Sequence, residues 1–377
     1  MDKWLKTNPD HNWLFGILSY DLKNEIEDLE SRNFDSIKSS ALKFFEADLV
    51  FDMIDNEIVI QYDKNGNYNS QRLKQEILGS KFEILALPYI SFRSPNNKSG
   101  YLKDVNALKD HIFRGDIYEI NYCREFYSVD VDIDPLSLYL RLSQRSPAPF
   151  ASFTKIDEHY IFCTSPERFL KRKGDQLFSQ PIKGTLKRGE NDKLDQLMKT
   201  QLANSEKDRS ENIMIVDLVR NDLSRIALER SVTVDELCEI YSFADLHHMI
   251  STISCKIKGE TSFADIINAT FPMGSMTGAP KVRAMKLIEK YEHSKRGIYS
   301  GALGYIEPNN DFDLNVLIRT VVYNINTKTI SMSSGGAITS ESNAEMEYQE
   351  SLLKLKAIFE ILNGEQPKEK IEVETNS

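Results

Sequence analysis

The sequence predicts an α+β fold with large antiparallel sheets. Segments of alternating β-branched and aromatic residues follow one another with short polar turns, and segments with helical spacing of apolar residues separate these groups. No repeat or low-complexity linker divides the 377 residues. We therefore expect one continuous domain over residues 1–364, with an N-terminal sheet region (1–100) and a core (101–364), and a charged, disordered tail at 365–377.

Local composition predicts the elements of the N-terminal third. Residues 13–24 begin apolar and turn polar, and the acidic segment 25–31 has helical character. Ser, Pro, Asn and Gly gather at 95–100 and indicate a surface break. Residues 105–114 then follow a helical pattern, and the alternating residues after Gly115 predict a strand.

Two groups of strands are expected further along the chain. The first is a meander of three strands with a tight turn at 173–175. The second is another meander with polar connections. The segments are 160–164, 169–172 and 176–180 in the first group, and 298–307, 312–323 and 329–334 in the second.

Three helices are expected between and after these strands. Apolar residues at helical spacing predict one around 211–219. Pro280 suits the first turn of another, with Thr277 or Gly278 as its cap. A stripe from Leu352 to Leu362 predicts the last helix, which ends at 363–364.

The composition is that of a globular protein without a nucleic-acid surface. Hydrophobic residues make up 41% and charged residues 28%, and 47 Lys and Arg face 57 Asp and Glu, for a formal net charge of −10. Phosphate backbones need an excess of basic side chains, so this balance argues against nucleic acid, although a few local cations can still bind a small anion. The polar N-terminus predicts no signal peptide, and no apolar run reaches the roughly 18 residues of a membrane span. Four scattered cysteines without a CxxC pair predict reduced thiols in a cytoplasmic protein.

Lys183 lies in the stretch QPIKGT (180–185), at the end of an expected strand. Composition alone favours an exposed lysine, because most lysine side chains lie at the surface. The alternative is a nucleophilic amine, which requires that desolvation or neighbouring cations hold the amine neutral.

Two pairs of carboxylates are spaced to share helix faces. Asp208 and Glu211 are three residues apart, as are Glu347 and Glu350, and Lys354 follows four residues later. Carboxylates that meet from two helices suit Mg²⁺, which prefers oxygen ligands. Either pair alone is more often a solvated face. Glu211 nevertheless begins the apolar stripe of its helix, and Glu347 follows a glycine-containing turn.

Two small-residue segments allow close approach of the backbone to a ligand. Residues 274–281 (GSMTGAPK) open onto a helix N-terminus, where free backbone N–H groups can bind an anion, although a plain cap is an equal alternative. The segment is one residue too short for a phosphate-binding GxxxxGK[ST] loop. Gly335 and Gly336 offer either a ligand contact or a tight strand exit.

Two further side chains stand out in expected strands. His247 and His248 are adjacent and so point to opposite faces, which favours a core or hydrogen-bonding role over a shared metal. Arg319 lies in an apolar strand, where a buried guanidinium needs an anionic partner from the protein or from a ligand.

Taken in order, these segments resemble the chorismate-utilising enzymes. The likeness extends over about 108–362, with an early segment at 16–21, and implies antiparallel sheets packed as a sandwich with helices on the outside. The matching motifs are SPER (165–168), ENIMIVDLVRND (211–222), GSMTGAPK (274–281) and EYQE (347–350). PIKGT at 181–185 is similar to the aminodeoxychorismate synthases. Anthranilate synthases have alanine in place of Lys183, and isochorismate and salicylate synthases have a lysine where Glu119 stands.

The resemblance implies amination of chorismate to 4-amino-4-deoxychorismate, in 4-aminobenzoate and folate biosynthesis. Lys183, held neutral, would add to the ring, Glu167 would be the general acid for the departing hydroxyl, and His248 would lie near that group. Mg²⁺ would be bound by Glu211 and Glu350, with Asp208 and Glu347 behind them. The implied substrate-binding residues are Ser275, Thr277, Tyr305, Arg319, Gly335, Gly336 and Lys354.

The ammonia for this reaction needs a source. The chain has no Gly-x-Cys-x-Gly elbow, so the resemblance implies a separate glutamine amidotransferase subunit, component II. Two residues depart from the family pattern: Asp208 stands where relatives often have glutamate, and Ala337 stands where they often have glycine. Relatives also carry more residues ahead of Trp13, and those residues would include part of the first sheet and any tryptophan pocket there. Two alternatives stay open: an anthranilate synthase component I and a non-catalytic chorismate-binding regulatory subunit.

Overall fold

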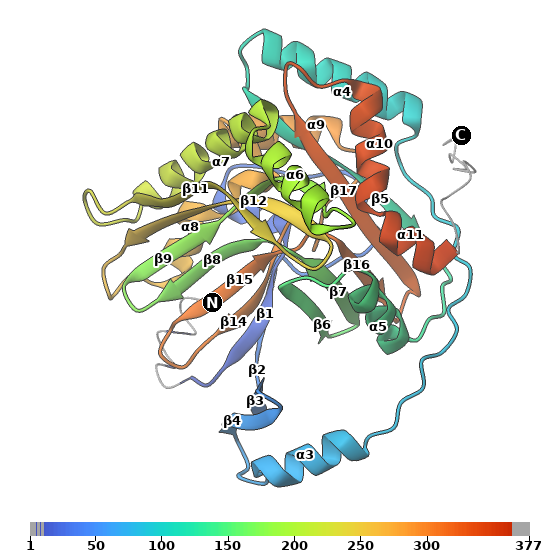
Figure 1. Ribbon diagram of the computed structural model, residues 1–377, viewed down its shortest axis with the longest axis vertical. Coiled ribbons are helices and arrows are strands. Elements are labelled where there is room, and N and C mark those ends of the chain that lie inside the picture. Colours follow the sequence, from blue (N-terminus) through green and yellow to red (C-terminus); the bar gives the residue numbers. More distant parts are fainter. Residues whose placement is uncertain (1–4, 6–7, 9–10, 364–377) are drawn as a thin grey trace.

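Two antiparallel sheets packed face to face form the body of the protein in the computed structural model, which describes residues 5, 8 and 11–363 (Figure 1). An apolar cluster between the sheets contains Ile17 from one sheet and Ile161 and Val322 from the other. Helices cover the outer faces of both sheets (Figure 1). The expected α+β sandwich with helices outside is therefore confirmed.

The larger sheet has nine strands within the described residues, in the order β10-β12-β9-β8-β15-β14-β1-β2, with β11 on the other edge of β12. β9 and β10 follow each other along one edge of β12. The strands are β1 (Leu14–Leu18), β2 (Leu42–Glu46), β8 (Arg168–Lys173), β9 (Gln176–Gln180), β10 (Ile182–Lys187), β11 (Thr233–Ser242), β12 (Leu246–Lys256), β14 (Ala302–Ile306) and β15 (Phe312–Val316).

The smaller sheet has the order β13-β5-β17-β16-β7-β6. Its long central pair, β5 and β17, is in continuous register from Ile120 opposite Ile338 to Ser128 opposite Ile330. The strands are β5 (Glu119–Ser128), β6 (Phe150–Ile156), β7 (His159–Ser165), β13 (Gly278–Ala279), β16 (Thr320–Asn324) and β17 (Thr329–Ile338).

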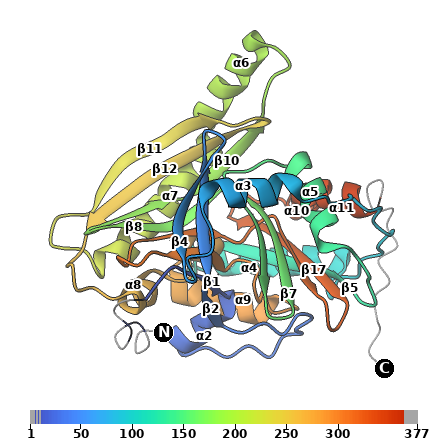
Figure 2. The same ribbon diagram turned by 90° about the horizontal axis from the view of Figure 1, so that it is seen from below.

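Two 3₁₀ turns and a set of helices complete the body. The long helix α7 packs against the larger sheet, and α4, α10 and α11 pack on the smaller one (Figure 1). In the view of Figure 2, α6 projects beyond the sheets beside β11 and β12. The elements are η1 (Tyr20–Leu22), α2 (Lys23–Ile26), α4 (Lys98–Phe113), α5 (Pro135–Arg145), α6 (Asp192–Ala203), α7 (Glu206–Ser224), α8 (Phe263–Thr270), η2 (Gly274–Met276), α9 (Lys281–Tyr291), α10 (Ala344–Lys354) and α11 (Lys356–Asn363).

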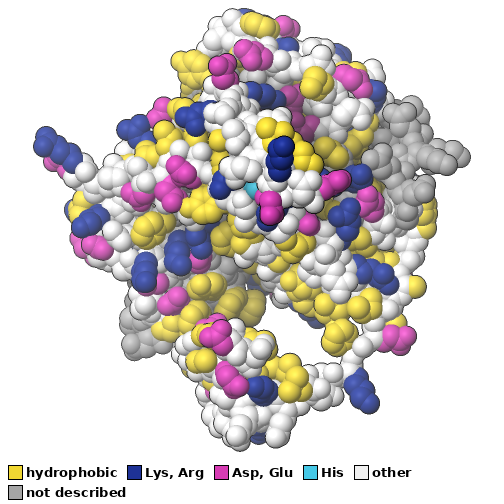
Figure 3. Space-filling view, in the orientation of Figure 1, with side chains coloured by type: hydrophobic (Ala, Val, Ile, Leu, Met, Phe, Trp, Pro, Cys, Tyr) yellow, Lys and Arg dark blue, Asp and Glu magenta, His cyan; other side chains and the backbone are white. Residues whose placement is uncertain are grey.

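An arm leaves the body after β2 and returns before α4. It consists of the hairpin β3 (Leu49–Ile54) and β4 (Glu57–Asp63), followed by α3 (Ser70–Gly79). An opening separates the arm from the body in the space-filling view (Figure 3). No helix among the residues that the structure describes is long and apolar enough to cross a membrane.

Several expected elements are placed differently by the structure. Both predicted meanders are wrong as single sheets, because the chain changes sheet between β7 and β8 and again between β15 and β16. The predicted strand 312–323 is therefore broken at Leu317–Arg319, and Arg319 has a left-handed φ of 49°.

The helix boundaries differ too. Only Lys23–Ile26 is helical near the acidic segment 25–31. The last helix is two helices that meet at Leu355, and α9 begins at Lys281 with Pro280 as its N-cap and no side-chain cap. The expected tail at 365–377 and the helix end at Gly364 lie outside the described residues.

Candidate active site

Lys183 lies in a bulge that the local sequence creates. Pro181 separates β9 from β10, and the pairing of β10 with β12 shifts between Ile182 and Thr185. Gly184 has a φ of +86°, and a Cβ there would lie 2.9 Å from the Cβ of Asp208, so only glycine allows β10 to approach α7 this closely. The Lys183 side chain is 11% exposed, which excludes the reading as an ordinary surface lysine.

The partner of Lys183 is Glu119 on β5. The two side chains are joined by a 3.3 Å ion pair between Lys183 Nζ and Glu119 Oε1, and Glu119 is 1% exposed. The other oxygen, Glu119 Oε2, is buried and has no hydrogen-bond partner within the described residues.

The charge on Lys183 differs from the expectation. Burial lowers the pKa of the Lys183 amine, but the carboxylates of Glu119, Glu211 and Glu167 outweigh burial and hold the pKa above its ordinary value. The prediction of an amine held neutral by neighbouring cations is therefore wrong for this structure. Lys183 is an ammonium because acidic groups surround it.

Glu167, between β7 and β8, is 96% buried at the same place. Its Oε1 accepts a 2.6 Å hydrogen bond from Ser275 Oγ in η2. Burial raises the pKa of Glu167 to about 7, and the Ser275 hydroxyl and the Lys183 ammonium oppose this rise. A carboxyl that keeps its proton near neutral pH is suited to general acid chemistry.

The two predicted carboxylate pairs face a common space from α7 and α10. Lys207, on α7, has its pKa raised: burial lowers it, and the carboxylates of Glu211, Glu347, Glu350 and Asp208 outweigh burial. The Lys207 Nζ is 3.8 Å from Glu211 Oε1. The four carboxylates are therefore close enough to act on one ammonium group, and we call these four residues the acidic cluster.

The carboxyls of the acidic cluster respond differently to their surroundings. Burial is the main cause that raises the pKa of Glu211 and of Glu347. Burial also acts to raise the pKa of Glu350, but the ammonium groups of Lys354, Lys207 and Lys183 outweigh it and lower that pKa. Each of these three glutamates is thus either penalised by burial or stabilised by a nearby cation.

The donor set of the acidic cluster fits a hard divalent cation. Within residues 5, 8 and 11–363, no three His, Cys, Asp or Glu side chains form a ready metal site. Even so, Glu119 and the four carboxylates of the acidic cluster face only three ammonium groups, those of Lys183, Lys207 and Lys354. A bound Mg²⁺ would balance this excess of negative charge with oxygen ligands, after small side-chain movements.

Gly335 and Gly336 bring the β17 backbone to the acidic cluster. A Cβ at Gly336 would lie 3.3 Å from Glu347 Oε2 and 3.7 Å from Glu350 Oε1. Lys354 Nζ donates to the Gly335 carbonyl at 2.8 Å and pairs with Glu350 Oε1 at 2.8 Å. The predicted grouping of Gly335, Gly336 and Lys354 is therefore present.

His248 and Arg319 lie on the other side of Lys183. His248 Nδ1 and Thr185 Oγ1 share a 2.8 Å hydrogen bond, two residues from Lys183. Burial and then the positive charge of Arg319 lower the pKa of His248 to about 4, so the imidazole is neutral. Burial lowers the pKa of Arg319, and no carboxylate among the described residues pairs with its guanidinium. Arg319 is therefore a half-buried cation without a carboxylate partner among the described residues, and it can accept an anionic ligand.

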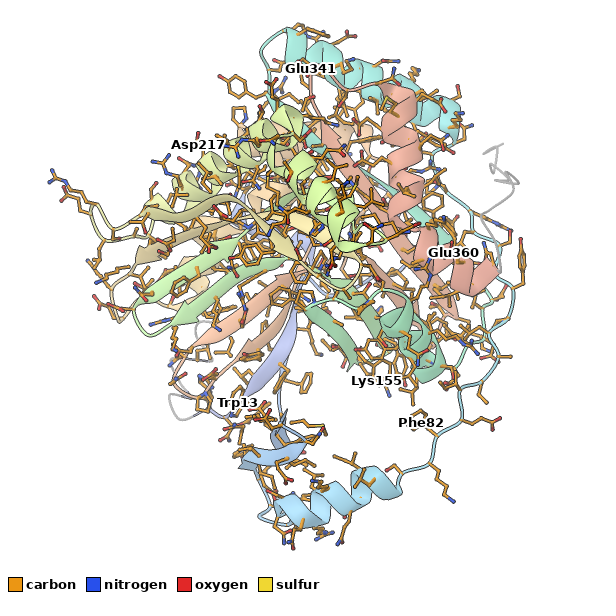
Figure 4. All side chains as sticks on the ribbon, in the orientation of Figure 1. Trp13, Phe82, Lys155, Asp217, Glu341 and Glu360 are labelled. Carbon is orange, nitrogen blue, oxygen red and sulfur yellow. The ribbon has the colours of Figure 1, made fainter. Side chains whose placement is uncertain are left out.

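Two predicted substrate-binding residues, Thr277 and Tyr305, use their side chains in other contacts. Thr277 is fully buried, and its hydroxyl contacts the carbonyls of Met273 and Gly274, so it stabilises its own loop. The Tyr305 ring packs 5.5 Å from Trp13, which Figure 4 places near the arm, far from α7 and α10. Neither position supports the expected contact with substrate.

Sequence reasoning missed two members of the site, Glu119 and Lys207. Glu119 had a signal, because it is an acidic residue on the inward face of an alternating strand. Lys207 had none, since it reads as an ordinary helix-surface lysine. A cavity of about 570 Å³ between residues 88–93 and 128–132 lies away from all these groups. We place the site where the ionisable side chains converge.

Comparisons with known proteins show the family to which the chain belongs. A family model described as chorismate binding enzyme matches residues 1–360. "Aminodeoxychorismate synthase component 1" of Bacillus subtilis (strain 168) is 30% identical over 98% of the chain and 82% of that protein. "Aminodeoxychorismate synthase, chloroplastic" of Arabidopsis thaliana is 37% identical over 74% of the chain, which matches only 31% of that longer protein. The crystal structure of anthranilate synthase component I from Streptococcus pneumoniae TIGR4 superposes with a TM-score of 0.79 at 28% identity, over 91% of the chain and 79% of its own.

Proposed function

Because the chain belongs to the chorismate-binding enzymes, we propose that it aminates chorismate at C4 to give 4-amino-4-deoxychorismate, as an aminodeoxychorismate synthase component I in 4-aminobenzoate and folate biosynthesis. The observation that carries the proposal is the burial of Lys183 between Glu119 and Glu167, beside the acidic cluster. An amine in this position can reach a ring anchored by its carboxylates, whereas an exposed lysine could not.

The first step is proton transfer from Lys183 to Glu119. Lys183 starts as an ammonium, and the free oxygen of Glu119 is available to hold its proton. The neutral amine then adds at C2 of chorismate as the ring double bonds shift and the C4–O bond breaks. Glu167, which keeps its proton near neutral pH, gives that proton to the leaving hydroxyl, and water departs.

The second step restores the lysine. Ammonia adds at C4, the ring electrons shift back, and the bond between C2 and the Lys183 nitrogen breaks. Glu167, left ionised by the first step, can take a proton back from the incoming nitrogen, and neutral His248, hydrogen-bonded to Thr185, would lie near the departing group. The substrate carboxylates would be bound by Arg319, by Lys354 and by the backbone at Gly335 and Gly336.

Glu211 and Glu350, with Asp208 and Glu347 behind them, are the residues that would hold Mg²⁺. The bound metal would act as a Lewis acid toward a substrate carboxylate. It would also offset the negative charge that now raises the pKa of Lys183.

The proposed partner is a glutamine amidotransferase subunit that delivers ammonia. The "component 1" in the name of the Bacillus subtilis relative supports a two-subunit enzyme. All four cysteines are buried free thiols, which suits a reducing compartment such as the cytoplasm.

The test is incubation of the purified chain with chorismate, Mg²⁺ and ammonium, followed by separation of the products and mass analysis. We expect 4-amino-4-deoxychorismate, and an intermediate in which Lys183 carries chorismate less water. Lys183→Ala should abolish both. The matched control is Lys187→Ala, because Lys187 is exposed on the same strand and should be dispensable.

Other products would select other functions. Fluorescent anthranilate as the main product would favour the rival anthranilate synthase, which the superposition on the Streptococcus pneumoniae enzyme keeps in view. Binding of chorismate without turnover would favour a regulatory subunit. Full activity in Lys183→Ala would show that the covalent step is wrong.

A further inference from the structure

Glu125 is a buried carboxylate outside the candidate active site. It lies on β5, six residues after Glu119, on the face of the smaller sheet that is turned toward the larger one. Its exposed fraction is 4%, and hydroxyl-bearing side chains of Ser36, Ser294, Ser331 and Ser333 surround it. None of the proposed catalytic steps uses it.

The hydrogen bonds to Glu125 are unevenly shared between its two oxygens. Ser331 Oγ donates to Oε1 at 2.6 Å, and Ser36 Oγ donates to the same oxygen. Oε2 is buried and has no partner within the described residues. Since a buried carboxylate oxygen without a partner is costly, Oε2 calls for a ligand.

The charges around Glu125 are also unbalanced. The nearest basic residues have other partners: Lys295 Nζ lies 3.7 Å from Asp35 Oδ2, and Arg296 pairs with Glu292 at 2.7 Å. No ion pair within the described part of the chain reaches Glu125. Burial raises the pKa of Glu125 to about 7, so at neutral pH the carboxyl is close to ionisation.

A small cavity lies against Glu125. Its volume is about 20 Å³. Its wall includes the hydroxyl-bearing residues Ser36, Thr320, Ser331 and Ser333, together with Lys295 and Arg296, which are paired with Asp35 and Glu292. A cavity of this size holds one water-sized particle, which needs at least roughly 10–15 Å³. Mg²⁺ demands near-octahedral ligands and keeps several waters, so a single-particle pocket with one carboxylate does not suit it. One carboxylate and neutral hydroxyls instead match a single positive charge.

We propose that this cavity binds one dehydrated monovalent cation, with Glu125 Oε2 as its charged ligand and the hydroxyl oxygens of Ser36, Ser331 and Ser333 completing its shell. Sodium, potassium and ammonium share this chemistry. The ion joins β5 and β17 to residues 35–37 and 295–299, which also line the cavity. The same two strands carry Glu119 and Gly336, so the ion stabilises the frame of the candidate active site without contacting substrate.

The test compares monovalent salts at constant ionic strength and constant Mg²⁺. The melting temperature of the full chain is measured in choline chloride, whose cation is too large for the cavity, and then in sodium, potassium and ammonium chloride. We expect one of the three small cations to raise the melting temperature saturably, by about 3 °C. Glu125→Gln, which keeps the shape and removes the charge, should lose this response.

The matched control is Glu229→Gln, an equivalent change at a carboxylate that is 88% exposed, and it should respond as the parent chain does. If Glu125→Gln does not fold, Ser333→Ala provides the second variant and should shift the half-saturating concentration upward at least about fivefold. Crystals grown with thallium(I) should show one anomalous peak beside Glu125 Oε2. Equal salt responses in all variants, or no peak at Glu125, would overturn the proposal whether or not the chain aminates chorismate.

Discussion

The Lys183 amine donates to the Glu119 carboxylate across 3.3 Å, and the second oxygen of Glu119 has no partner within the described residues. The proposed nucleophile therefore rests as an ammonium beside a carboxylate with capacity for one more proton. In the proposed mechanism Glu119 has two effects: its charge raises the pKa of Lys183, and its free oxygen can receive the proton of Lys183.

Glu119→Gln separates these two effects. Removal of the charge lowers the pKa of Lys183 and so favours the neutral amine, whereas removal of the acceptor slows proton transfer. We expect the acceptor to dominate, with formation of the lysine adduct about 10²-fold slower near neutral pH and partial recovery as hydroxide rises. Single-turnover mass analysis across pH measures this. A variant that is faster than the parent chain at neutral pH would assign Glu119 a purely electrostatic role.

We predict that replacement of Glu167 stabilises the fold and lowers the activity. Its pKa is about 7 in the folded chain against an ordinary 4.5, so the folded state binds more protons and stability falls as pH rises from about 4.5 to about 7. Glu167→Gln should therefore stabilise the fold at pH 8 by on the order of 3 kcal/mol, with no gain at pH 4, and should slow turnover by about 10³-fold. Denaturant unfolding at both pH values and product assays measure the two effects. Equal stabilities at pH 8 would mean that the carboxyl is not buried as the structure places it.

Ser275→Ala tests the pKa of Glu167 by removing the hydroxyl that donates a hydrogen bond to it. The Ser275 hydroxyl stabilises the ionised form of Glu167 and so lowers its pKa. Loss of the hydroxyl should raise that pKa, and the rate should then persist to higher pH before it falls. The pH–rate profile of the parent chain is the reference. A basic limb that moves to lower pH would contradict the assigned hydrogen bond.

The sequence predicted the elements of this site better than their arrangement. Alternation located the strands, but it carries no information about which strand pairs with which, so β7 and β8 were joined in one meander although they belong to different sheets. The break at Arg319 was missed because its left-handed backbone serves a crossover between the sheets, which only the tertiary fold requires.

The site chemistry shows the same limit. The spacing in the sequence predicted that Asp208 pairs with Glu211 and Glu347 with Glu350 on their helix faces. The family resemblance predicted that the two pairs lie at one site. The charge state of Lys183 could not be read in this way, because it depends on Glu119, 64 residues away in the chain. Tyr305 was misplaced because a motif in a strand does not reveal which end of the sheet carries the site.

Alanine substitutions at the two adjacent glycines of β17 should cause different defects, one in stability and one in substrate binding. A Cβ at Gly335 would lie 2.5 Å from the Tyr122 carbonyl oxygen, so Gly335→Ala should destabilise the fold by about 2 kcal/mol or more. A Cβ at Gly336 meets only side-chain atoms of the acidic cluster and Lys354, at 3.3 Å or more. Gly336→Ala should therefore fold normally and raise the KM for chorismate about tenfold. Thermal unfolding and steady-state kinetics distinguish the two, and a reversed pattern would contradict the register of β17.

Lys207 should compete with the proposed Mg²⁺ for the acidic cluster. Its ammonium acts on all four carboxylates, so Lys207→Ala should bind Mg²⁺ more tightly in the absence of substrate, by roughly three- to tenfold because the side chain is partly solvated. Titration calorimetry measures the affinity directly, without reference to turnover. Glu211→Gln is the opposing control and should weaken binding. Weaker Mg²⁺ binding by Lys207→Ala would place the metal elsewhere.

We predict that one substitution of Arg319 raises the free energy of unfolding and weakens chorismate binding. Its guanidinium is largely buried, burial lowers its pKa, and no carboxylate within the described residues pairs with it. Arg319→Met keeps the length of the side chain and removes the unpaired charge, so the free energy of unfolding should rise by about 1 kcal/mol. The chain should then lose chorismate affinity at least about 30-fold, because no other cation at that position can pair with the substrate carboxylate that Arg319 would bind. Denaturant unfolding and chorismate titration by calorimetry check both effects. A less stable variant with unchanged affinity would mean that Arg319 has a structural anion and no substrate role.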